Sequence, residues 1–114
     1  MTKEDRTMTA MTTMFHPIAP TEGYVYLIAH HERRRVKIGH SHNPLRRLKQ
    51  VQNGCPDCLS LVDYVPGGRA LETAFHRQFA DRRVMGEWFR DDDHLITQSF
   101  TRMAYSERMA DVAA

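Results

Sequence analysis

The sequence predicts an α/β fold of the α+β type, with a small central three-stranded antiparallel sheet flanked by helices. Two segments rich in β-branched and aromatic residues, at 23–29 and 35–39, follow each other closely and predict a hairpin. Apolar residues at helical spacing cover 44–53 and 69–79, and an alternating segment at 59–65 lies between them. This order of elements predicts helices packed against one sheet.

Each predicted strand is bounded by residues that interrupt regular structure. The first strand, Gly23 to Ala29, follows a Pro, Thr and Gly breaker, and the polar residues His30 to Arg34 connect it to the second. The second strand runs from Arg35 to Gly39. The third strand, Leu59 to Val65, ends at the turn-forming residues Pro66-Gly67-Gly68.

The helices carry recognisable start and stop signals. Asn43 is the expected N-cap of the first helix, Pro44 occupies its first position, and Asn53-Gly54 ends it. Its predicted buried stripe consists of Leu45, Leu48 and Val51. The second helix, Arg69 to Phe79, has a stripe of Leu71, Phe75 and Phe79.

Two signals follow the second helix. Gly86-Glu87-Trp88-Phe89 is interpreted as a turn followed by an aromatic anchor. The run Asp91–Asp93 favours the start of a last helix, whose end is polar and predicted to fray.

Length and composition predict one small domain. The 114 residues divide into a disordered leader at 1–20, a domain at 21–97 and a helical, frayed tail at 98–114. The leader has no hydrophobic segment typical of a signal peptide, and Met8, Met11 or Met14 could start the chain. With no membrane-spanning run and only two cysteines, the expected location is the cytoplasm.

Charge is unevenly distributed along the chain. Residues 21–90 hold 12 Lys/Arg and 7 Asp/Glu, a net charge of +5, whereas residues 91–114 hold 2 and 5, a net charge of −3. A basic body suits a polyanionic partner such as nucleic acid. A merely solubilising surface would have the same composition, so charge does not decide between the two.

Four spaced residues carry the functional hypothesis: Tyr26, Lys37, Arg47 and Glu72. An aromatic hydroxyl, two cations and an acid at the edge of an apolar stripe are the parts needed to hold a phosphodiester, a water and a divalent metal. Helix geometry places Arg47 at the border of the buried face, where it can reach over the sheet, and leaves Arg46 in solvent. A structural Arg at that border is the competing interpretation.

The other members of the set also have two interpretations each. The partner of Glu72, which shares its side of the helix with His76, is either Mg²⁺ or Arg47 in a structural ion pair. Tyr24 and Tyr26 share one strand face beside Lys37. They are either core residues, or Lys37 favours the phenolate of Tyr26, so that its hydroxyl can orient or deprotonate a water.

Further polar residues are weaker candidates. His40 and His42, at the end of the second strand, are interpreted either as phosphate contacts or as part of an exposed loop. Cys55-Pro56-Asp57-Cys58 has the spacing of a zinc half-site but needs two more ligands, and no second such motif is present. Reduced structural thiols are the preferred interpretation.

Together these residues resemble the GIY-YIG nuclease superfamily, in its branch of phage open reading frames and a meiotically upregulated gene product. The resemblance covers about residues 22–95. Tyr24-Val25-Tyr26 stands at the GIY position and Lys37-Ile38-Gly39 at the YIG position, and the later matches are Ser41-His42-Asn43-Pro44, Arg46-Arg47-Leu48, Glu72 with His76, and Gly86-Glu87-Trp88-Phe89.

The resemblance implies a phage or bacterial endonuclease that hydrolyses DNA. It implies that Glu72 binds Mg²⁺ or Mn²⁺, that Arg47 stabilises the phosphate and that Tyr26 activates or positions water. Lys37 replaces the second tyrosine of the family, and Glu87 lies where the family has a late Asn. Supporting or nucleic-acid-binding roles fall to Tyr24, Gly39, His40, His42, Arg46, His76 and Glu87.

With little added surface for reading bases, the domain is expected to cut structure-selectively or with weak specificity, or to be delivered by a partner protein. The first alternative is a non-catalytic nucleic-acid-binding module of the same fold. The second is a small interaction or metal-binding protein organised by Cys55 and Cys58.

Overall fold

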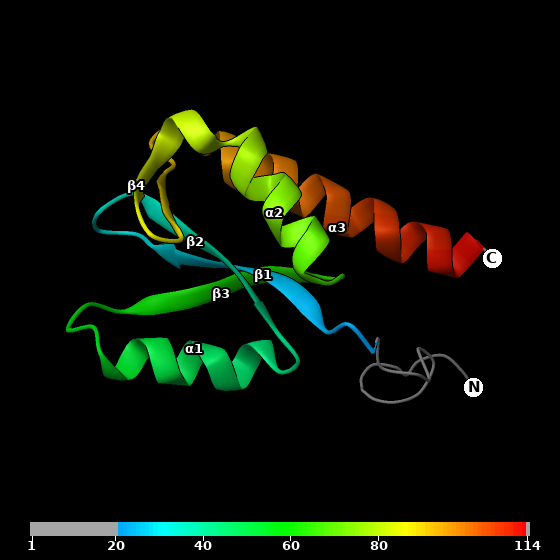
Figure 1. Ribbon diagram of the computed structural model, residues 1–114, viewed down its shortest axis with the longest axis horizontal. Helices are drawn as coiled ribbons and strands as arrows, with labels where there is room; N and C mark the ends of the chain where they lie inside the picture. The colour runs from blue at the N-terminus through cyan, green and yellow to red at the C-terminus, as the bar shows by residue number, and fades with distance from the viewer. Residues whose placement is uncertain (1–20, 114) are drawn as a thin grey trace.

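The computed structural model describes residues 21–113 (Figure 1), and the expected leader at 1–20 lies outside them. Three long strands, β1 (Tyr24–His30), β2 (Arg35–Ser41) and β3 (Leu59–Pro66), are followed by the short strands β4 (Arg83–Met85) and β5 (Trp88–Arg90). The α-helices are α1 (Pro44–Asn53), α2 (Arg69–Gln78) and α3 (Leu95–Ala113), and a 3-10 helix covers Ala80–Arg82. The expected boundary between residues 97 and 98 falls inside α3.

The α+β class is confirmed, but the prediction of three strands was wrong. The sheet has five antiparallel strands in the order β3-β1-β2-β5-β4. The two added strands have three residues each, too short to display the alternation by which a strand is recognised. The segment that was expected to be only a turn and an aromatic anchor therefore forms a hairpin whose second strand pairs with β2.

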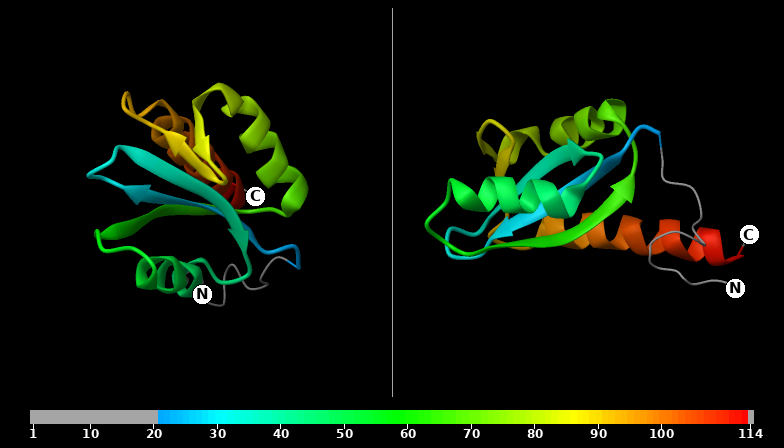
Figure 2. Two further views of the ribbon diagram at one scale, coloured as in Figure 1. Left: turned by 60° about the vertical axis from the view of Figure 1, so that its left-hand side comes forward. Right: turned by 90° about the horizontal axis from the view of Figure 1, so that it is seen from below.

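The alternation of side chains divides the sheet into two faces. In β1, Tyr26 and Ile28 point to the face that α1 covers, whereas Val25, Leu27 and Ala29 point to α2 and α3. Figures 1 and 2 show α1 alone on one side of the sheet, and α2 and α3 together on the other. The larger core therefore lies under α2 and α3, and a smaller one under α1.

Helix α1 begins as the sequence predicts, but its buried stripe is shifted. Asn43 caps it by accepting a hydrogen bond from the Arg46 N–H through Oδ1 at 3.1 Å. Leu45, expected in the stripe, is 62% exposed, and Pro44 is buried in its place. The face toward the sheet therefore follows Pro44, Leu48 and Val51, at intervals of four and three residues.

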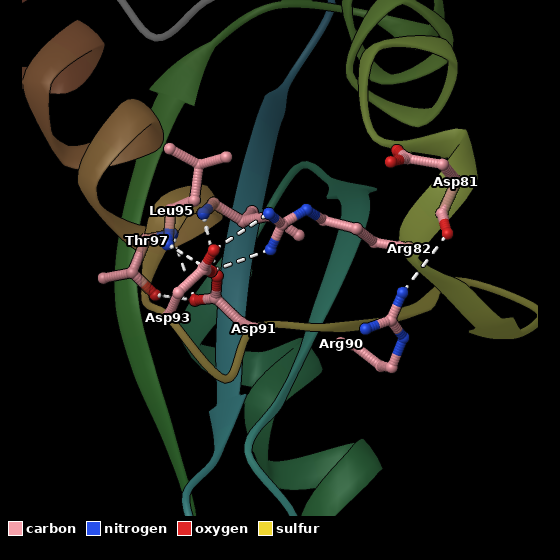
Figure 3. A network of polar contacts seen from close by, with 8 residues as sticks. Asp81, Arg82, Arg90, Asp91, Asp93, Leu95 and Thr97 are labelled. Carbon is pink, nitrogen blue, oxygen red and sulfur yellow. Dashed lines mark hydrogen bonds and ion pairs between the residues drawn. The ribbon is translucent and has the colours of Figure 1, made fainter.

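The start of α3 is held by a polar network (Figure 3). Buried Asp91 accepts hydrogen bonds from the backbone N–H groups of Ile96 and Thr97 and from the Thr97 hydroxyl. Arg82 donates to both oxygens of Asp93 at 2.8 and 2.9 Å. These bonds set the helix so that Ile96, Phe100 and Ala104 enter the larger core.

Among residues 21–113, no helix is long and apolar enough to cross a lipid bilayer.

Candidate functional site

The candidate site lies on the α1 face of the sheet, where β2 runs past the end of β5. The pairing of β2 with β5 covers only Arg35 to Lys37. Beyond it, the Ile38 N–H donates to the carbonyl of Glu87 at 3.1 Å, and the Ile38 carbonyl accepts from His76 Nε2 at 2.9 Å. The β4–β5 turn and helix α2 therefore close this edge, and each brings an acid to it, Glu87 and Glu72.

Tyr26 is fully buried, and its ring lies over Gly39. The two residues are opposite each other in the β1–β2 register, and a Cβ atom on Gly39 would overlap the hydroxyl end of the ring. The ring can pass across β2 only because position 39 has no side chain. The Tyr26 hydroxyl is thereby carried toward the strand edge where Glu72 and Glu87 lie, and it has no hydrogen-bond partner among the described residues.

Of the two roles expected of Tyr26 toward a water, the surroundings of its hydroxyl favour orienting the water over deprotonating it. Burial raises the pKa of Tyr26 above 10.0, and the nearby charge of Glu87 raises it further, while Arg47 acts in the opposite direction. Lys37 does not favour the phenolate, because its charge is engaged by Glu87. At neutral pH Tyr26 is therefore a neutral hydroxyl that can orient a water but does not carry a charge.

Lys37 and Glu87 form a half-buried ion pair. Lys37 Nζ donates to Glu87 Oε1 at 2.9 Å, across 50 residues of sequence. The Lys37 ammonium also lies 5.8 Å from the centre of the Trp88 ring. Burial by itself would raise the pKa of Glu87, but the hydrogen bond and charge of Lys37 hold it below its ordinary value. Glu87 is thus an ionised carboxylate in the site.

Glu72 is the most unusual group of the site. It is 5% exposed, its Oε2 has no hydrogen-bond partner among the described residues, and its nearest cation is exposed Arg69, 3.6 Å from Oε1. Burial and the neighbouring charge of Glu87 raise the pKa of Glu72. A buried carboxylate in this state needs a proton or a further cation. Two neighbouring acids, of which only Glu87 is paired with a lysine, suit a divalent ion.

Two of the predicted basic residues lie as helix geometry indicates. Arg47 is half-buried on α1, donates from Nε to Gln50 Oε1 at 3.0 Å, and is close enough to Tyr26 to lower its pKa. Arg46 is exposed. No ion pair joins Arg47 to Glu72 in the described part of the chain, so the guanidinium of Arg47 keeps donors for a ligand.

The three predicted histidines have different surroundings. His76 donates to the Ile38 carbonyl and contacts the edge of Phe89, so it anchors α2 against β2 beside the site. His40 lies opposite Val25 in the register, on the α2 and α3 face, and its Nε2 contacts the Glu22 carbonyl. His42 is exposed next to α1. The structure therefore does not bring His40 or His42 to Tyr26.

Tyr24 lies two residues from Tyr26 on the same face, beside a residue that sequence reasoning missed. The rings of Tyr24 and Tyr64 meet edge to face, with centroids 5.2 Å apart. Tyr64 is opposite Tyr26 in the β1–β3 register. The aromatic character of residues 59–65 marks a strand, but only the register of β1 with β3 places Tyr64 beside the site.

The cysteine motif belongs to a separate cluster at the other end of β1. Ligand atoms of His30, Cys55 and Asp57 lie within 4.8 Å of one another, and His30 Nε2 is 3.1 Å from Asp57 Oδ2. The Arg33 N–H donates to His30 Nδ1, so the ring proton is on Nε2 and is directed at Asp57. A metal at Nε2 would need the proton at Nδ1, where the Arg33 donor already lies. The hydrogen bond between His30 and Asp57 explains this cluster without an ion.

Comparison with known proteins places the chain in a family. A family model described as the T5orf172 domain matches residues 23–104, which cover the sheet, α1, α2 and the buried turns of α3. No curated protein and no solved structure matches the chain.

Proposed function

The chain belongs to the T5orf172 domain family, and from this premise we propose that it is a metal-dependent endonuclease that hydrolyses DNA phosphodiester bonds. A nuclease or DNA-binding role is what this phage-associated domain suggests. We further propose that its residues are arranged as in GIY-YIG nucleases. The spacing of Tyr26, Lys37, Arg47 and Glu72 supports this, as does their gathering at one edge of the sheet.

One observation carries the proposal. Within residues 21–113, one oxygen of the buried Glu72 carboxylate and the buried Tyr26 hydroxyl have no hydrogen-bond partner. Both groups lie near a second carboxylate, Glu87. Buried polar groups without partners are rare in folded proteins and are concentrated at sites that receive a ligand. If these residues had only a structural role, Glu72 would be expected to form an ion pair with Arg47. No ion pair joins the two residues in the described part of the chain.

The donor set fits Mg²⁺ or Mn²⁺. Mg²⁺ is usually bound by one or two carboxylates and keeps several of its waters, so Glu72 would hold it with Glu87 as the second carboxylate. When bound, the ion supplies positive charge against the charge that develops on the phosphate.

Each of the remaining residues has its own role in in-line hydrolysis. The half-buried guanidinium of Arg47 binds the phosphate with its free donors. The neutral Tyr26 hydroxyl orients the attacking water, since its raised pKa keeps it protonated. Lys37 is held in place by Glu87 and adds a second positive charge toward the phosphate.

Cleavage of plasmid DNA with Mg²⁺ or Mn²⁺ tests the proposal. Wild type should nick the plasmid only when metal is added, and Glu72→Gln should not nick it. Glu107→Gln, which changes an exposed glutamate outside the site, should behave as wild type. Retained, salt-dependent binding without cleavage by wild type would overturn the catalytic proposal and favour a binding module of the same fold.

A further inference from the structure

A surface pocket opens beside the proposed site, and the catalytic residues do not use it. It has a volume of about 180 Å³ and is lined by Tyr24, His42, Asn43, Pro44, Leu45 and Tyr64. Pockets that enclose a whole small molecule usually measure about 300–1,000 Å³. This one is therefore the right size for one planar group, with the rest of the ligand outside it.

The pocket lining has the chemistry of a stacking site. Tyr64 is 38% exposed and Leu45 is 62% exposed, so both present apolar surface at the pocket. The rings of Tyr24 and Tyr64 meet at 80°, so a flat group that stacks on one ring meets the edge of the other. Asn43 uses Oδ1 in the helix cap, and its NH₂ group is left to donate.

The position of the pocket next to the proposed phosphate site indicates which kind of molecule would carry the flat group. Tyr24 is two residues from Tyr26 on the same strand face, a separation of about 7 Å. Pro44 is one helical turn before Arg47 on α1. Two elements therefore each carry one pocket residue and one residue of the proposed phosphate site. A base in the pocket and a phosphate at Arg47 would therefore be held by neighbouring parts of the same two elements.

We propose that this pocket receives one unpaired nucleobase next to the scissile phosphate, and that the enzyme consequently prefers DNA with an unpaired nucleotide at the cut. The proposal rests on the proposed nuclease function and specifies its substrate class. In a paired duplex each base is stacked between its neighbours and cannot reach a pocket at the side. An aromatic platform accepts any base, so the preference is for structure and not for sequence.

Three forms of one oligonucleotide duplex test this inference: fully paired, with a single bulged nucleotide, and with an abasic residue at the bulge. Wild type should cut the bulged form faster than the paired form, and the abasic form should lose the advantage although it is equally flexible. Tyr64→Ala should reduce the ratio of bulged to paired cleavage by roughly 5- to 100-fold, the range expected for loss of one stacked base. Tyr64→Phe, which keeps the ring, should preserve the ratio.

Tyr105→Ala removes a tyrosine of α3 that is more exposed than Tyr64, at 64% against 38%, and lies outside the pocket lining. It serves as the control, with an unchanged ratio. Equal cleavage of the paired and bulged forms by wild type would overturn the inference and leave the nuclease proposal intact.

A second measurement separates the failure of the two proposals. If no form is cut, the nuclease proposal fails, and binding of a duplex with 2-aminopurine as the bulged base still tests the pocket. Quenching of its fluorescence by wild type and Tyr64→Phe, but not by Tyr64→Ala, supports stacking. Equal fluorescence with all three proteins overturns it.

Discussion

The ring of Tyr26 lies directly over the Cα of Gly39, on the neighbouring strand, in the space that any side chain at position 39 would fill. This contact links a glycine with no chemistry of its own to the proposed reaction. It is the reason that a buried tyrosine can present its hydroxyl at the strand edge, near the charges of Glu72 and Glu87.

Gly39→Ala is expected to displace Tyr26. The added methyl group overlaps the ring, so the hydroxyl shifts and the cleavage rate falls by about 100-fold, as for a misplacement of about 1 Å. Overpacking should also lower the free energy of unfolding by about 1–3 kcal/mol. Gly54→Ala is the control, because a Cβ there meets only the Val51 carbonyl at 3.9 Å. Wild-type nicking by Gly39→Ala would show that the position of Tyr26 is not critical.

Glu72→Gln is expected to stabilise the metal-free protein at neutral pH. The pKa of Glu72 is raised from 4.5 by burial. A carboxyl with a raised pKa destabilises the fold progressively as the pH rises above 4.5, and fully once the pH exceeds its folded-state value. The Tm values of Glu72→Gln and wild type should be equal near pH 4. Toward pH 7, the Tm of the variant should become progressively higher than that of wild type.

The same pair of proteins tests the metal ligand without an activity assay. Mg²⁺ at about 100 times its Kd should stabilise wild type by about 2.7 kcal/mol. It should leave Glu72→Gln almost unaffected. An equal rise in Tm for both proteins would assign the ion to another position.

Lys37→Met is expected to move the acidic limb of the pH–rate profile to higher pH. Lys37 holds the pKa of Glu87 below 4.5. Without the cation, Glu87 loses the largest influence that lowers its pKa and keeps only the smaller ones of Glu72 and His76. Its pKa therefore rises, and it becomes protonated at a higher pH. Lys37→Arg keeps the charge and should keep the wild-type limb. Superimposable profiles for wild type and Lys37→Met would show that Glu87 does not contribute to activity.

Arg47→Ala should lower cleavage by about 100-fold or more, the usual effect of removing one transition-state donor. Arg46→Ala is the neighbouring control, because Arg46 is exposed and Arg47 is half-buried beside Tyr26. Its rate should stay close to wild type. Steady-state kinetics on a fluorescent oligonucleotide measures both. The opposite result would reverse the assignment of the two arginines.

Asp91→Ala should destabilise the fold without involving the site. The variant loses the acceptor for two backbone N–H groups and one hydroxyl at the start of α3 (Figure 3). The expected loss is about 2 kcal/mol, which lowers Tm by about 10 °C in a domain of this size. Asp92→Ala, at an exposed position, should unfold like wild type.

The local signals in the sequence predicted the long elements well. The strands β1, β2 and β3 and the helices α1 and α2 follow from alternation, helical spacing and caps such as Asn43-Pro44, all of which act over a few residues. The two short strands, β4 and β5, were not predicted, because three residues are too few to show the alternation of a strand. In α1, Leu48 and Val51 face the sheet as predicted, but Pro44 is buried where Leu45 was expected, and Leu45 is exposed.

Sequence spacing also selected the four residues of the proposed site, but not their electrostatics. Chemical type and interval pointed to Tyr26, Lys37, Arg47 and Glu72. Whether Tyr26 is a phenolate or a neutral hydroxyl depends on burial and on which acid engages Lys37, and these depend on contacts between residues up to 50 apart. The sequence therefore left open whether Tyr26 orients a water or deprotonates it.

The sequence by itself determined the α+β class, the long elements and the identity of the chemical groups, because these depend on local backbone preferences and on residue type. Only the tertiary structure decided that Tyr26 crosses over Gly39, that Glu87 engages Lys37, and that Glu72 keeps an unpaired oxygen. It also placed Tyr64 beside Tyr24. The physical reason is that strand register and burial set which distant side chains meet, and those meetings set their charge states.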